Sequence, residues 1–332
     1  KVLIIYTGGT IGMTRTDKGY APLSGYFREA LERIPDLASE DIPAWELLEM
    51  SPLLDSSDMT VNEWNSIARI IFERYADYDG FVVLHGTDTM AYTASALSFI
   101  LGGVNKPIVL TGSQIPLAEG RSDGRDNLIT SLIIAGDGIA NEVCLYFSGK
   151  LLRGNRAMKM SADGLMAFDS PNYPHLADVG ISIRYNRAAL LTPRGGELRY
   201  HPFRAVPIGV IKVFPGVQFS LFEQIMTDKL SGIVLEGFGT GNIPDKSGEL
   251  LPIVRRAFDA GVLVVVCSQC PEGAVSLGAY ETSTPLKRAG AIGGGDMTTE
   301  AAVTKLYYLR SLEIPPSAAA DFMAKNISGE LT

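Results

Sequence analysis

Apolar and polar positions along the chain follow two different periods. Strand-like apolar runs, rich in Val, Ile and Leu as in strands that are buried on both faces, lie at 2–6, 45–50, 81–85, 107–112, 142–147, 208–214, 232–239 and 262–267. Apolar residues at helical spacing occur at 27–34, 62–75, 90–101, 126–136 and 298–310. Because the two kinds of segment alternate, the pattern predicts βαβ units and a mostly parallel sheet with helices on its faces.

A polar stretch at 185–206, punctuated by prolines, interrupts this alternation. Single hydrophobic cores stop growing at roughly 250–300 residues, so a chain of 332 residues has room for two domains. We therefore expect an α/β fold with two α/β domains. The larger, N-terminal parallel-sheet domain would span 1–185, followed by a linker at 186–206 and a smaller, Rossmann-like domain at 207–332.

Small polar residues follow four of the predicted strands in the first half of the chain. The segments after the runs that begin at 2, 45, 81 and 107 are TGGTIG, SPLLDSSDM, HGTDTM and TGSQIP. In a parallel sheet the C-terminal ends of the strands meet at one edge, which is where open α/β sheets bind ligands. We therefore expect these hydroxyls, carboxylates and glycine amides to converge on one site.

A purely structural explanation competes with this expectation. Ser, Thr and Asp are preferred at helix N-termini, so Thr60 could cap the helix predicted at 62–75. Asp88 or Thr89 could in the same way cap the helix predicted at 90–101. One cap for each helix is enough, however, and the four segments together carry more hydroxyls than capping requires.

Composition narrows the classes of function. A formal net charge of -8 and a pI near 5.1 disfavour a nucleic-acid binder. Apolar residues make up 46% of the chain, and no apolar run approaches the roughly 20 residues that span a bilayer, so we expect no membrane role. The chain begins at or beside a predicted strand without a signal-peptide pattern, and we expect a cytoplasmic protein.

The three cysteines, Cys144, Cys267 and Cys270, are too few and odd in number for a disulfide framework, which fits a reducing compartment. Cys267 and Cys270 have the CxxC spacing of a redox or zinc pair. No second such pair exists, and the chain has only three histidines. We expect no metal site and interpret the pair as small residues at the end of a buried strand.

Motifs that bind a nucleotide or activate a serine are missing from the sequence. The fingerprint GxGxxG fails at Thr7, no GxxxxGK occurs, and the string most similar to GxSxG is AVSLG at 274–278. We therefore expect a threonine-based site without a cofactor. A threonine hydroxyl needs a partner that takes its proton, and candidates are Asp88 and Lys159, which follows the strand-like YFSGKLL. Tyr20 in DKGYAP is a candidate lid tyrosine. A solvated surface charge for Lys159 and a loop aromatic for Tyr20 stay open as alternatives.

The motifs TGGTIG, HGTDTM and TGSQIP together resemble the bacterial-type L-asparaginase family. YTGGTIGM, PLLDSSDM, HGTDTMAYTASALSF and RGNR are similar to its type I, cytoplasmic branch in particular. The resemblance extends from Val2 to the C-terminal ISGELT, which is nearly the whole chain. It implies an amidohydrolase that converts L-asparagine to L-aspartate and ammonia without a metal or organic cofactor, assembled as a homodimer or homotetramer.

The resemblance also implies catalytic roles for individual residues. Thr10 would be the nucleophile that forms a β-aspartyl enzyme. Thr87, Asp88 and Lys159 would handle the protons needed to activate the nucleophile, the water or both, and both threonines count as catalytic. Tyr20 matches a tyrosine on the flap that closes the site.

Substrate-binding residues follow from the same resemblance. Asp55, Ser56 and Ser57, together with Thr87 and Asp88, would hold the α-amino and α-carboxylate groups of the substrate. Serine hydroxyls and backbone amides suit the carboxylate, and the Asp88 carboxylate suits the ammonium.

One position departs from the family. Allosteric bacterial type I relatives carry an arginine where this chain has Glu236, and they use it with the region that matches Ser268 to Cys270 to bind a regulatory asparagine. A carboxylate at Glu236 would repel the α-carboxylate of that effector. We therefore expect an altered regulatory site and little or no positive cooperativity with asparagine.

Three other functions compete with asparagine hydrolysis. The first is an amidase of broader specificity that accepts glutamine or acts as a component of an amidotransferase. The second is a non-catalytic amino-acid sensor on the same scaffold. The presence of Thr10, Thr87, Asp88 and Lys159 disfavours the sensor. The third, a nucleotide-binding oxidoreductase, is disfavoured by Thr7 in the fingerprint.

Overall fold

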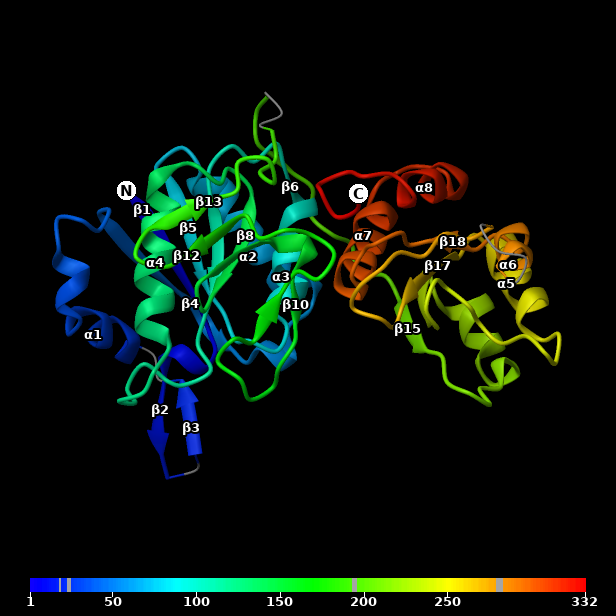
Figure 1. Cartoon of the computed structure of the whole chain (residues 1–332), viewed down its shortest axis with the longest axis horizontal. Helices are drawn as coiled ribbons and strands as arrows, with labels where there is room; N and C mark the ends of the chain where they lie inside the picture. Colours follow the sequence, from blue (N-terminus) through cyan, green and yellow to red (C-terminus); the bar gives the residue numbers. More distant parts are fainter. Residues whose placement is uncertain (18, 23–24, 193–195, 279–282) are drawn as a thin grey trace. The chain divides into compact units, whose positions relative to one another are not determined.

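The computed structural model contains two compact units, Lys1–Tyr200 and His201–Thr332, which are described separately (Figure 1). It describes residues 1–17, 19–22, 25–192, 196–278 and 283–332. The larger unit has a mostly parallel sheet and the smaller one a parallel sheet with helices, so the predicted fold class is confirmed. The boundaries 1–185, 186–206 and 207–332 stay a proposal. Two residues of the proposed linker, Arg199 and Tyr200, pair with a strand of the N-terminal unit.

A large sheet forms the centre of the N-terminal unit. Among the described residues its strands are, in sheet order, β13 (Ile183–Tyr185), β12 (Ala177–Val179), β9 (Lys150–Arg153), β8 (Val143–Phe147), β7 (Ile108–Thr111), β5 (Gly80–Leu84), β1 (Val2–Gly8) and β4 (Trp45–Leu54). From β8 to β4 all neighbouring strands run parallel, whereas β9, β12 and β13 are antiparallel. The C-terminal ends of β4, β1, β5 and β7 therefore meet at one edge of the sheet, as the sequence predicts.

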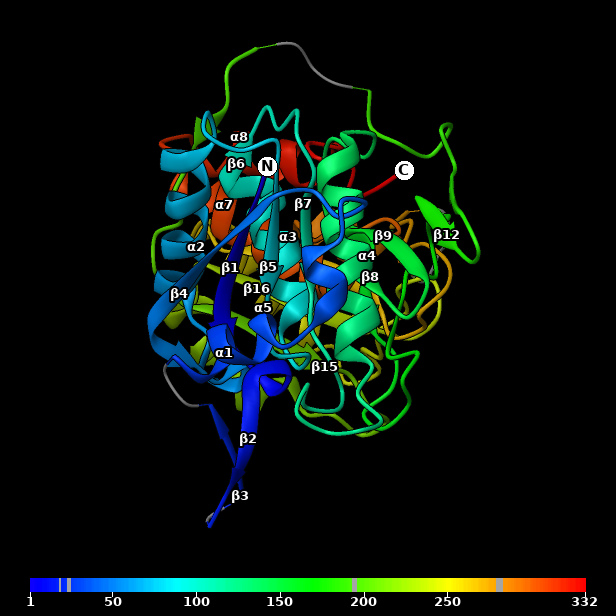
Figure 2. The ribbon, with the colours of Figure 1, turned by 90° about the vertical axis from the view of Figure 1, so that its left-hand side faces the viewer.

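Helices cover both faces of this sheet, which explains why β1 is buried throughout (Figures 1 and 2). The helices are α1 (Tyr26–Glu32), α2 (Val61–Arg74), α3 (Met90–Ile100) and α4 (Gly124–Asp137). Val2, Ile4 and Tyr6 of β1 form one core cluster with apolar residues of α1 and α4. Tyr6 stacks on Phe27 of α1 with ring centroids 4.2 Å apart. On the other face, α2 and α3 are joined by a hydrogen bond of 3.0 Å from Trp64 to Thr93.

Three pairs of short strands complete the described part of the unit. They are the hairpin β2 (Met13–Thr16) and β3 (Gly19–Pro22), the hairpin β10 (Met158–Lys159) and β11 (Phe168–Asp169), and the pair β6 (Leu101–Gly102) and β14 (Arg199–Tyr200). The β2–β3 hairpin projects from the body of the unit (Figure 2). The β10–β11 hairpin carries Lys159.

Two predicted segments differ in detail from the observed elements. The strand expected at 45–50 continues to Leu54, so the polar segment after it begins at Asp55. The strand-like YFSGKLL contains a turn, because Ser148 and Gly149 have positive φ angles of 46° and 84°. It therefore forms two antiparallel strands, β8 and β9.

The C-terminal unit contains a smaller sheet whose strands run parallel in chain order. These strands are β15 (Ile208–Lys212), β16 (Gly232–Gly237), β17 (Leu263–Ser268) and β18 (Ile292–Gly293). The helices are α5 (Leu250–Asp259), α6 (Thr284–Ala289), α7 (Thr299–Ser311) and α8 (Pro316–Met323). Apolar residues of β16, β17, α5 and α6 share one core cluster.

A buried ion pair fixes the C-terminal ISGELT segment to this unit. Lys305 of α7 lies 2.5 Å from Glu330, and both side chains are fully buried. The Lys305 ammonium also donates to the carbonyl of Met323 at 3.0 Å, and Glu330 accepts from the amides of Ile327 and Ser328. A buried pair of this kind holds its two segments together because removal of one partner leaves an uncompensated charge.

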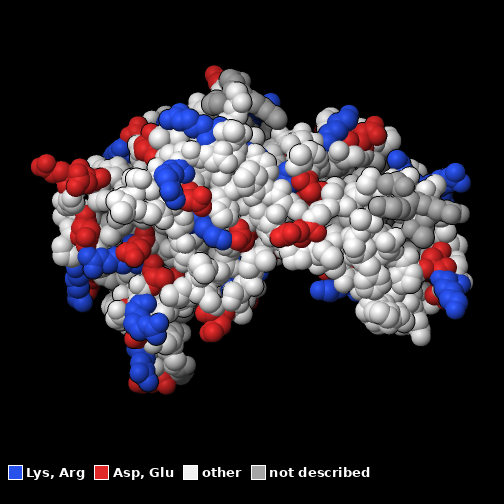
Figure 3. Space-filling model, viewed as in Figure 1, with Lys and Arg blue, Asp and Glu red and all other residues white. Residues whose placement is uncertain are grey.

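Basic and acidic side chains are interspersed on the face of the molecule in Figure 3, where neither sign gathers into one extended patch. Within the described ranges no helix is long and apolar enough to cross a membrane.

Candidate active site

The C-terminal ends of β4, β1 and β5 are packed against one another through glycines. A Cβ atom added at Gly8 or Gly9 would come within 3.0 Å of the backbone of Leu54 or Gly86, respectively, a separation that real Cβ atoms essentially never show. A Cβ atom at Gly86 would be equally close to the Ser56 hydroxyl. The glycines therefore bring three polar strand ends into direct contact.

Thr10 lies where β1 ends. It is the first residue of a 3₁₀ turn, Thr10–Gly12, and it follows Gly9, whose φ of 85° favours glycine. The amide of Gly12 closes the turn by donating to the Gly9 carbonyl at 3.3 Å. Because Gly9 touches the backbone of Gly86, Thr10 lies at the strand end that adjoins Thr87.

Thr87, Asp88 and Lys159 form one hydrogen-bonded cluster. The Lys159 ammonium donates to the Thr87 hydroxyl at 3.0 Å and to the Asp88 carboxylate at 2.7 Å. The Lys159 side chain is only 19% exposed. The alternative interpretation of Lys159 as a solvated surface charge is therefore wrong. The β10–β11 hairpin thus places the Lys159 ammonium at the edge of the sheet where Thr10 and Thr87 lie.

Gln114, in the segment after β7, also belongs to this cluster. The Thr87 hydroxyl donates to Gln114 Oε1 at 3.0 Å. The segment TGSQIP was expected to reach the site, but Gln114 was not among the predicted site residues. Its position at a fourth strand end was the available signal, because the ends of parallel strands converge.

Asp55, Ser56 and Ser57 lie at the end of β4. Asp55 accepts hydrogen bonds of 2.9 Å from both the amide and the hydroxyl of Ser57, which shapes the turn after the strand. Ser56 is buried, and its carbonyl accepts from the Thr89 hydroxyl at 2.6 Å. Thr89 therefore links the ends of β4 and β5, and its side chain does not cap α3.

The capping prediction for the preceding helix is confirmed. The Thr60 side chain accepts from the Asn62 amide, and Glu63 completes a capping box for α2. One of the expected caps therefore has a structural role, while Thr89 contributes to the strand edge instead.

Tyr20 does not take part in the contacts around Lys159. It lies on β3, is 49% exposed and donates to the Glu119 carboxylate at 2.7 Å. This hydrogen bond raises the pKa of the Tyr20 phenol. Its role on a closing flap stays a prediction.

His85 has a structural role at the end of β5. Its ring is completely buried, with Nδ1 2.7 Å from the Gly86 carbonyl and Nε2 2.9 Å from the Thr93 hydroxyl. Burial lowers the pKa of the imidazole to about 4. A neutral ring that donates from Nδ1 to Gly86 and accepts from Thr93 satisfies both contacts and holds the Gly86 backbone in place.

The cysteine pair lacks the character of a redox site. Cys267 is buried, and burial raises the pKa of its thiol to about 12, whereas Cys270 is exposed. Among the described residues, no three His, Cys, Asp or Glu side chains cluster in a way that could hold a metal ion. The interpretation of Cys267 as a small residue at the end of β17 agrees with this environment.

Two carboxyl groups, Glu236 and Glu300, lie in the region of the proposed regulatory site, and Lys212 is the register partner of Glu236 on strand β15. Glu236 accepts a hydrogen bond of 2.6 Å from Thr299, and the strand that carries it lies beside β17, which ends at Ser268. The Ser268 hydroxyl accepts from the Cys270 amide at 3.0 Å. Burial, with a smaller contribution from Glu236, raises the pKa of Glu300 nearby. Glu236 and Ser268 lie on neighbouring strands, as a shared site requires. The carboxyl groups of Glu236 and Glu300 disfavour binding of the effector's carboxylate there.

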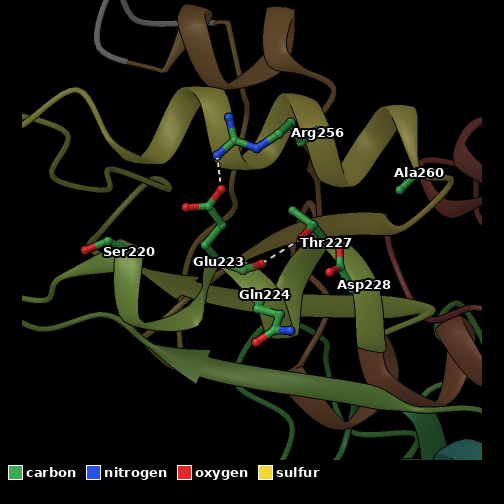
Figure 4. Close-up of a pocket in the computed structure, with 7 residues that line it drawn as sticks. All are labelled: Ser220, Glu223, Gln224, Thr227, Asp228, Arg256 and Ala260. Atoms are coloured by element: carbon green, nitrogen blue, oxygen red, sulfur yellow. Dashed lines mark hydrogen bonds and ion pairs between the residues drawn. The ribbon is translucent and has the colours of Figure 1, made fainter.

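A shallow pocket of about 500 Å³ lies in the C-terminal unit, between α5 and the helical turns before β16 (Figure 4). It is lined by Ser220, Glu223, Gln224, Thr227, Asp228, Arg256 and Ala260. Arg256 is paired with Glu223, and both side chains are about half exposed. None of the candidate catalytic residues lines this pocket.

Gly9→Ala tests the contact between the strand ends. Gly138 is a matched control, because it also has a positive φ, 68°, but a Cβ atom there would meet nothing within 4 Å. Gly138→Ala should cost about 1 kcal/mol from backbone strain alone. Gly9→Ala should cost at least about 2 kcal/mol more, because its Cβ atom overlaps the Gly86 backbone. Urea unfolding of both variants measures the difference, and equal losses would contradict the packing described.

Comparison with known proteins places both units in one family. The family model described as asparaginase, N-terminal, matches residues 1–191. The family model described as glutaminase/asparaginase C-terminal domain matches residues 207–323. L-asparaginase 1 of Escherichia coli K12 is 46% identical over 331 residues, which cover 100% of this chain and 98% of the relative.

Two solved structures extend the similarity to the fold. L-asparaginase I from Vibrio cholerae has a TM-score of 0.93 and 42% identity, covering 100% of this chain and 98% of its own. The thermostable L-asparaginase from Thermococcus kodakarensis has a TM-score of 0.89 and 35% identity. The match covers 100% of this chain and 99% of that structure's chain. The family resemblance expected from TGGTIG and HGTDTM is thereby confirmed, and the chain belongs to the asparaginase family.

Proposed function

We propose that this protein hydrolyses L-asparagine to L-aspartate and ammonia. The observation that supports the proposal most strongly is the cluster of Lys159, Thr87 and Asp88 at the strand edge where Thr10 also lies. A nucleophile needs a partner that moves its proton, and this edge supplies two hydroxyls, a cation and a carboxylate in a protein of the asparaginase family.

In the first step, Thr10 Oγ1 attacks the carbon of the side-chain amide. The C–N bond breaks, the nitrogen leaves as ammonia with the proton that Thr10 loses, and a β-aspartyl ester forms on Thr10. Water then attacks the ester carbon, and one of its protons restores the Thr10 hydroxyl as aspartate departs. The amides of the glycine-rich turn after β1 would stabilise the oxyanion of each tetrahedral state.

Lys159, Thr87 and Asp88 would support these proton transfers. The Lys159 ammonium is held by Asp88, so it can stabilise negative charge that develops on nearby oxygens. Its low exposure strengthens this effect, because water screens a buried cation less than a surface one. We keep Thr87 as a second catalytic hydroxyl, since it receives the hydrogen bond from Lys159 directly.

The end of β4 would bind the α-groups of the substrate. Asp55 fixes the turn that presents Ser56 and Ser57, and the Ser57 hydroxyl and neighbouring amides suit an α-carboxylate. Thr87 and the Asp88 carboxylate, which is 65% exposed, would contact the same end of the substrate, with Asp88 receiving the α-ammonium. Tyr20 would close over the bound substrate.

The remaining features of the proposal follow from the family. We propose a homodimer or homotetramer in the cytoplasm, acting without a metal or organic cofactor. Both relatives named in the structural comparison are described as L-asparaginases.

Ammonia release by the purified protein tests the reaction. We expect release from L-asparagine, with less from L-glutamine and D-asparagine, and a loss of kcat of at least about 1,000-fold in Thr10→Ala, because the nucleophile is removed. Thr14→Ala is a matched control on the neighbouring hairpin strand. If asparagine raises the melting temperature of the wild type but no ammonia appears, the protein is a sensor and the proposal fails.

The dependence of the rate on asparagine concentration tests Glu236. We expect a hyperbolic curve with a Hill coefficient near 1, because Glu236 and the buried Glu300 disfavour an effector carboxylate in this region. Glu236→Arg replaces the negative charge with the positive one found in allosteric relatives and serves as the comparison. A clearly sigmoidal curve for the wild type would rule out the expectation.

A further inference from the structure

We propose that Gln114 is a positioning residue that fixes the direction of the Thr87 hydroxyl proton and tethers the hairpin that carries Lys159. This inference rests on the proposed function, because it assigns the proton of a proposed catalytic hydroxyl. Gln114 is half-buried and lies between Thr87 and the loop of the β10–β11 hairpin.

The backbone at Gln114 is held firmly. The Gln114 amide donates to both oxygens of the Asp123 carboxylate, at 3.1 and 3.0 Å, and the Ile115 amide donates to the first of them at 3.0 Å. Asn127 of α4 donates to the carbonyl of Gly112 just before this segment at 3.0 Å. The side chain of Gln114 therefore projects from a fixed point after β7.

The surroundings of Gln114 fix the orientation of its terminal amide. Nε2 faces two carbonyl oxygens, those of Ala162 at 3.4 Å and Gly164 at 3.2 Å. Both can only accept hydrogen bonds, so the nitrogen must be on their side. The reversed amide would place three oxygens against one another. Oε1 is consequently the atom that faces Thr87.

This orientation determines where the Thr87 proton lies. Gln114 Oε1 can only accept, so the Thr87 hydroxyl must donate to it. On its other side Thr87 accepts from the Lys159 ammonium. The Thr87 proton therefore points away from Lys159, and its oxygen lone pair points toward it. In this state Lys159 does not receive the proton of Thr87, which supports Thr10 as the first nucleophile.

Gln114 also closes a ring of contacts through the hairpin. The loop whose carbonyls it binds follows Lys159 directly and is folded back by a hydrogen bond of 2.7 Å from the Met160 amide to the Ala167 carbonyl. Lys159 in turn contacts Thr87. One glutamine thus holds the hydroxyl by its oxygen and the cation-bearing hairpin by its nitrogen.

Gln114→Met tests both functions, because it keeps the length of the side chain but forms neither hydrogen bond. We expect kcat for L-asparagine to fall about tenfold to a hundredfold with KM changed less than about threefold, since a misplaced catalytic group affects the reaction more than binding. Gln224→Met, at an exposed glutamine of the C-terminal unit, is the control and should leave both constants unchanged.

Gln114→Glu provides a pH signature that a merely structural role would not give. The carboxylate keeps an acceptor for Thr87 but repels the carbonyls of Ala162 and Gly164. The protonated acid can accept from Thr87 and donate to a carbonyl. Charged groups around this position include Asp123, Asp88, Lys159 and Asp163 of the hairpin loop, and all four are present in both proteins. The activity of Gln114→Glu relative to the wild type should therefore rise as the pH falls from about 8 to about 5, toward the ordinary pKa of a glutamate.

Hydrogen exchange of the segment 160–167 tests the tether without turnover. We expect exchange in Gln114→Met to be at least about threefold faster than in the wild type, because the loop loses its anchor. Unchanged exchange, or wild-type kcat in an active Gln114→Met protein, would overturn the inference. If the wild type releases no ammonia but exchange still accelerates, the proposed reaction fails and the tether stands.

Discussion

The close approach of the ends of β4, β1 and β5 is the constraint on which the site depends. Gly8, Gly9 and Gly86 leave no room for a side chain at the points where these strand ends touch. Their contact places Thr10, Thr87 and Ser56 at one edge of a sheet in which strand β1 is completely buried. The rigid sheet fixes the position of this edge, while the glycines allow the polar segments to approach one another.

A largely buried cation is the second requirement of this edge. The Lys159 side chain is only 19% exposed, and its removal from water is offset by the Asp88 carboxylate and the Thr87 hydroxyl. His85 contributes differently, because burial keeps its imidazole neutral near pH 7 and lets it brace the Gly86 backbone without adding charge. The electrostatic character of the site therefore depends on one lysine and the carboxylate that holds it.

Much of this architecture could be predicted from the sequence, because its determinants are local. Buried strands and amphipathic helices leave apolar periods, and the parallel order of β4, β1, β5 and β7 brings their polar ends together by geometry alone. Thr10, Thr87 and Asp88 could be recognised for this reason. The turn at Ser148 and Gly149 within YFSGKLL was missed because the apolar pattern continues on both sides of it.

The contacts of Lys159 and Gln114 could not be predicted in the same way. Lys159 reaches Thr87 across 72 positions of the chain, so the family resemblance indicated this lysine, whereas the local pattern of RGNRAMKM does not distinguish it from a surface charge. Gln114 acquires its role only because a hairpin loop from a distant part of the chain supplies two carbonyls. Tyr20 contacts Glu119 instead of the cluster, and its proposed role concerns the protein with substrate bound.

Mass spectrometry of the acid-quenched protein during turnover of L-asparagine tests the central claim most directly. Proteolytic peptides that carry Thr10 and Thr87 can be compared for an added aspartyl group. We expect the group on Thr10, because Thr87 donates its proton to Gln114 and is held by Lys159. An aspartyl ester on Thr87 would contradict it.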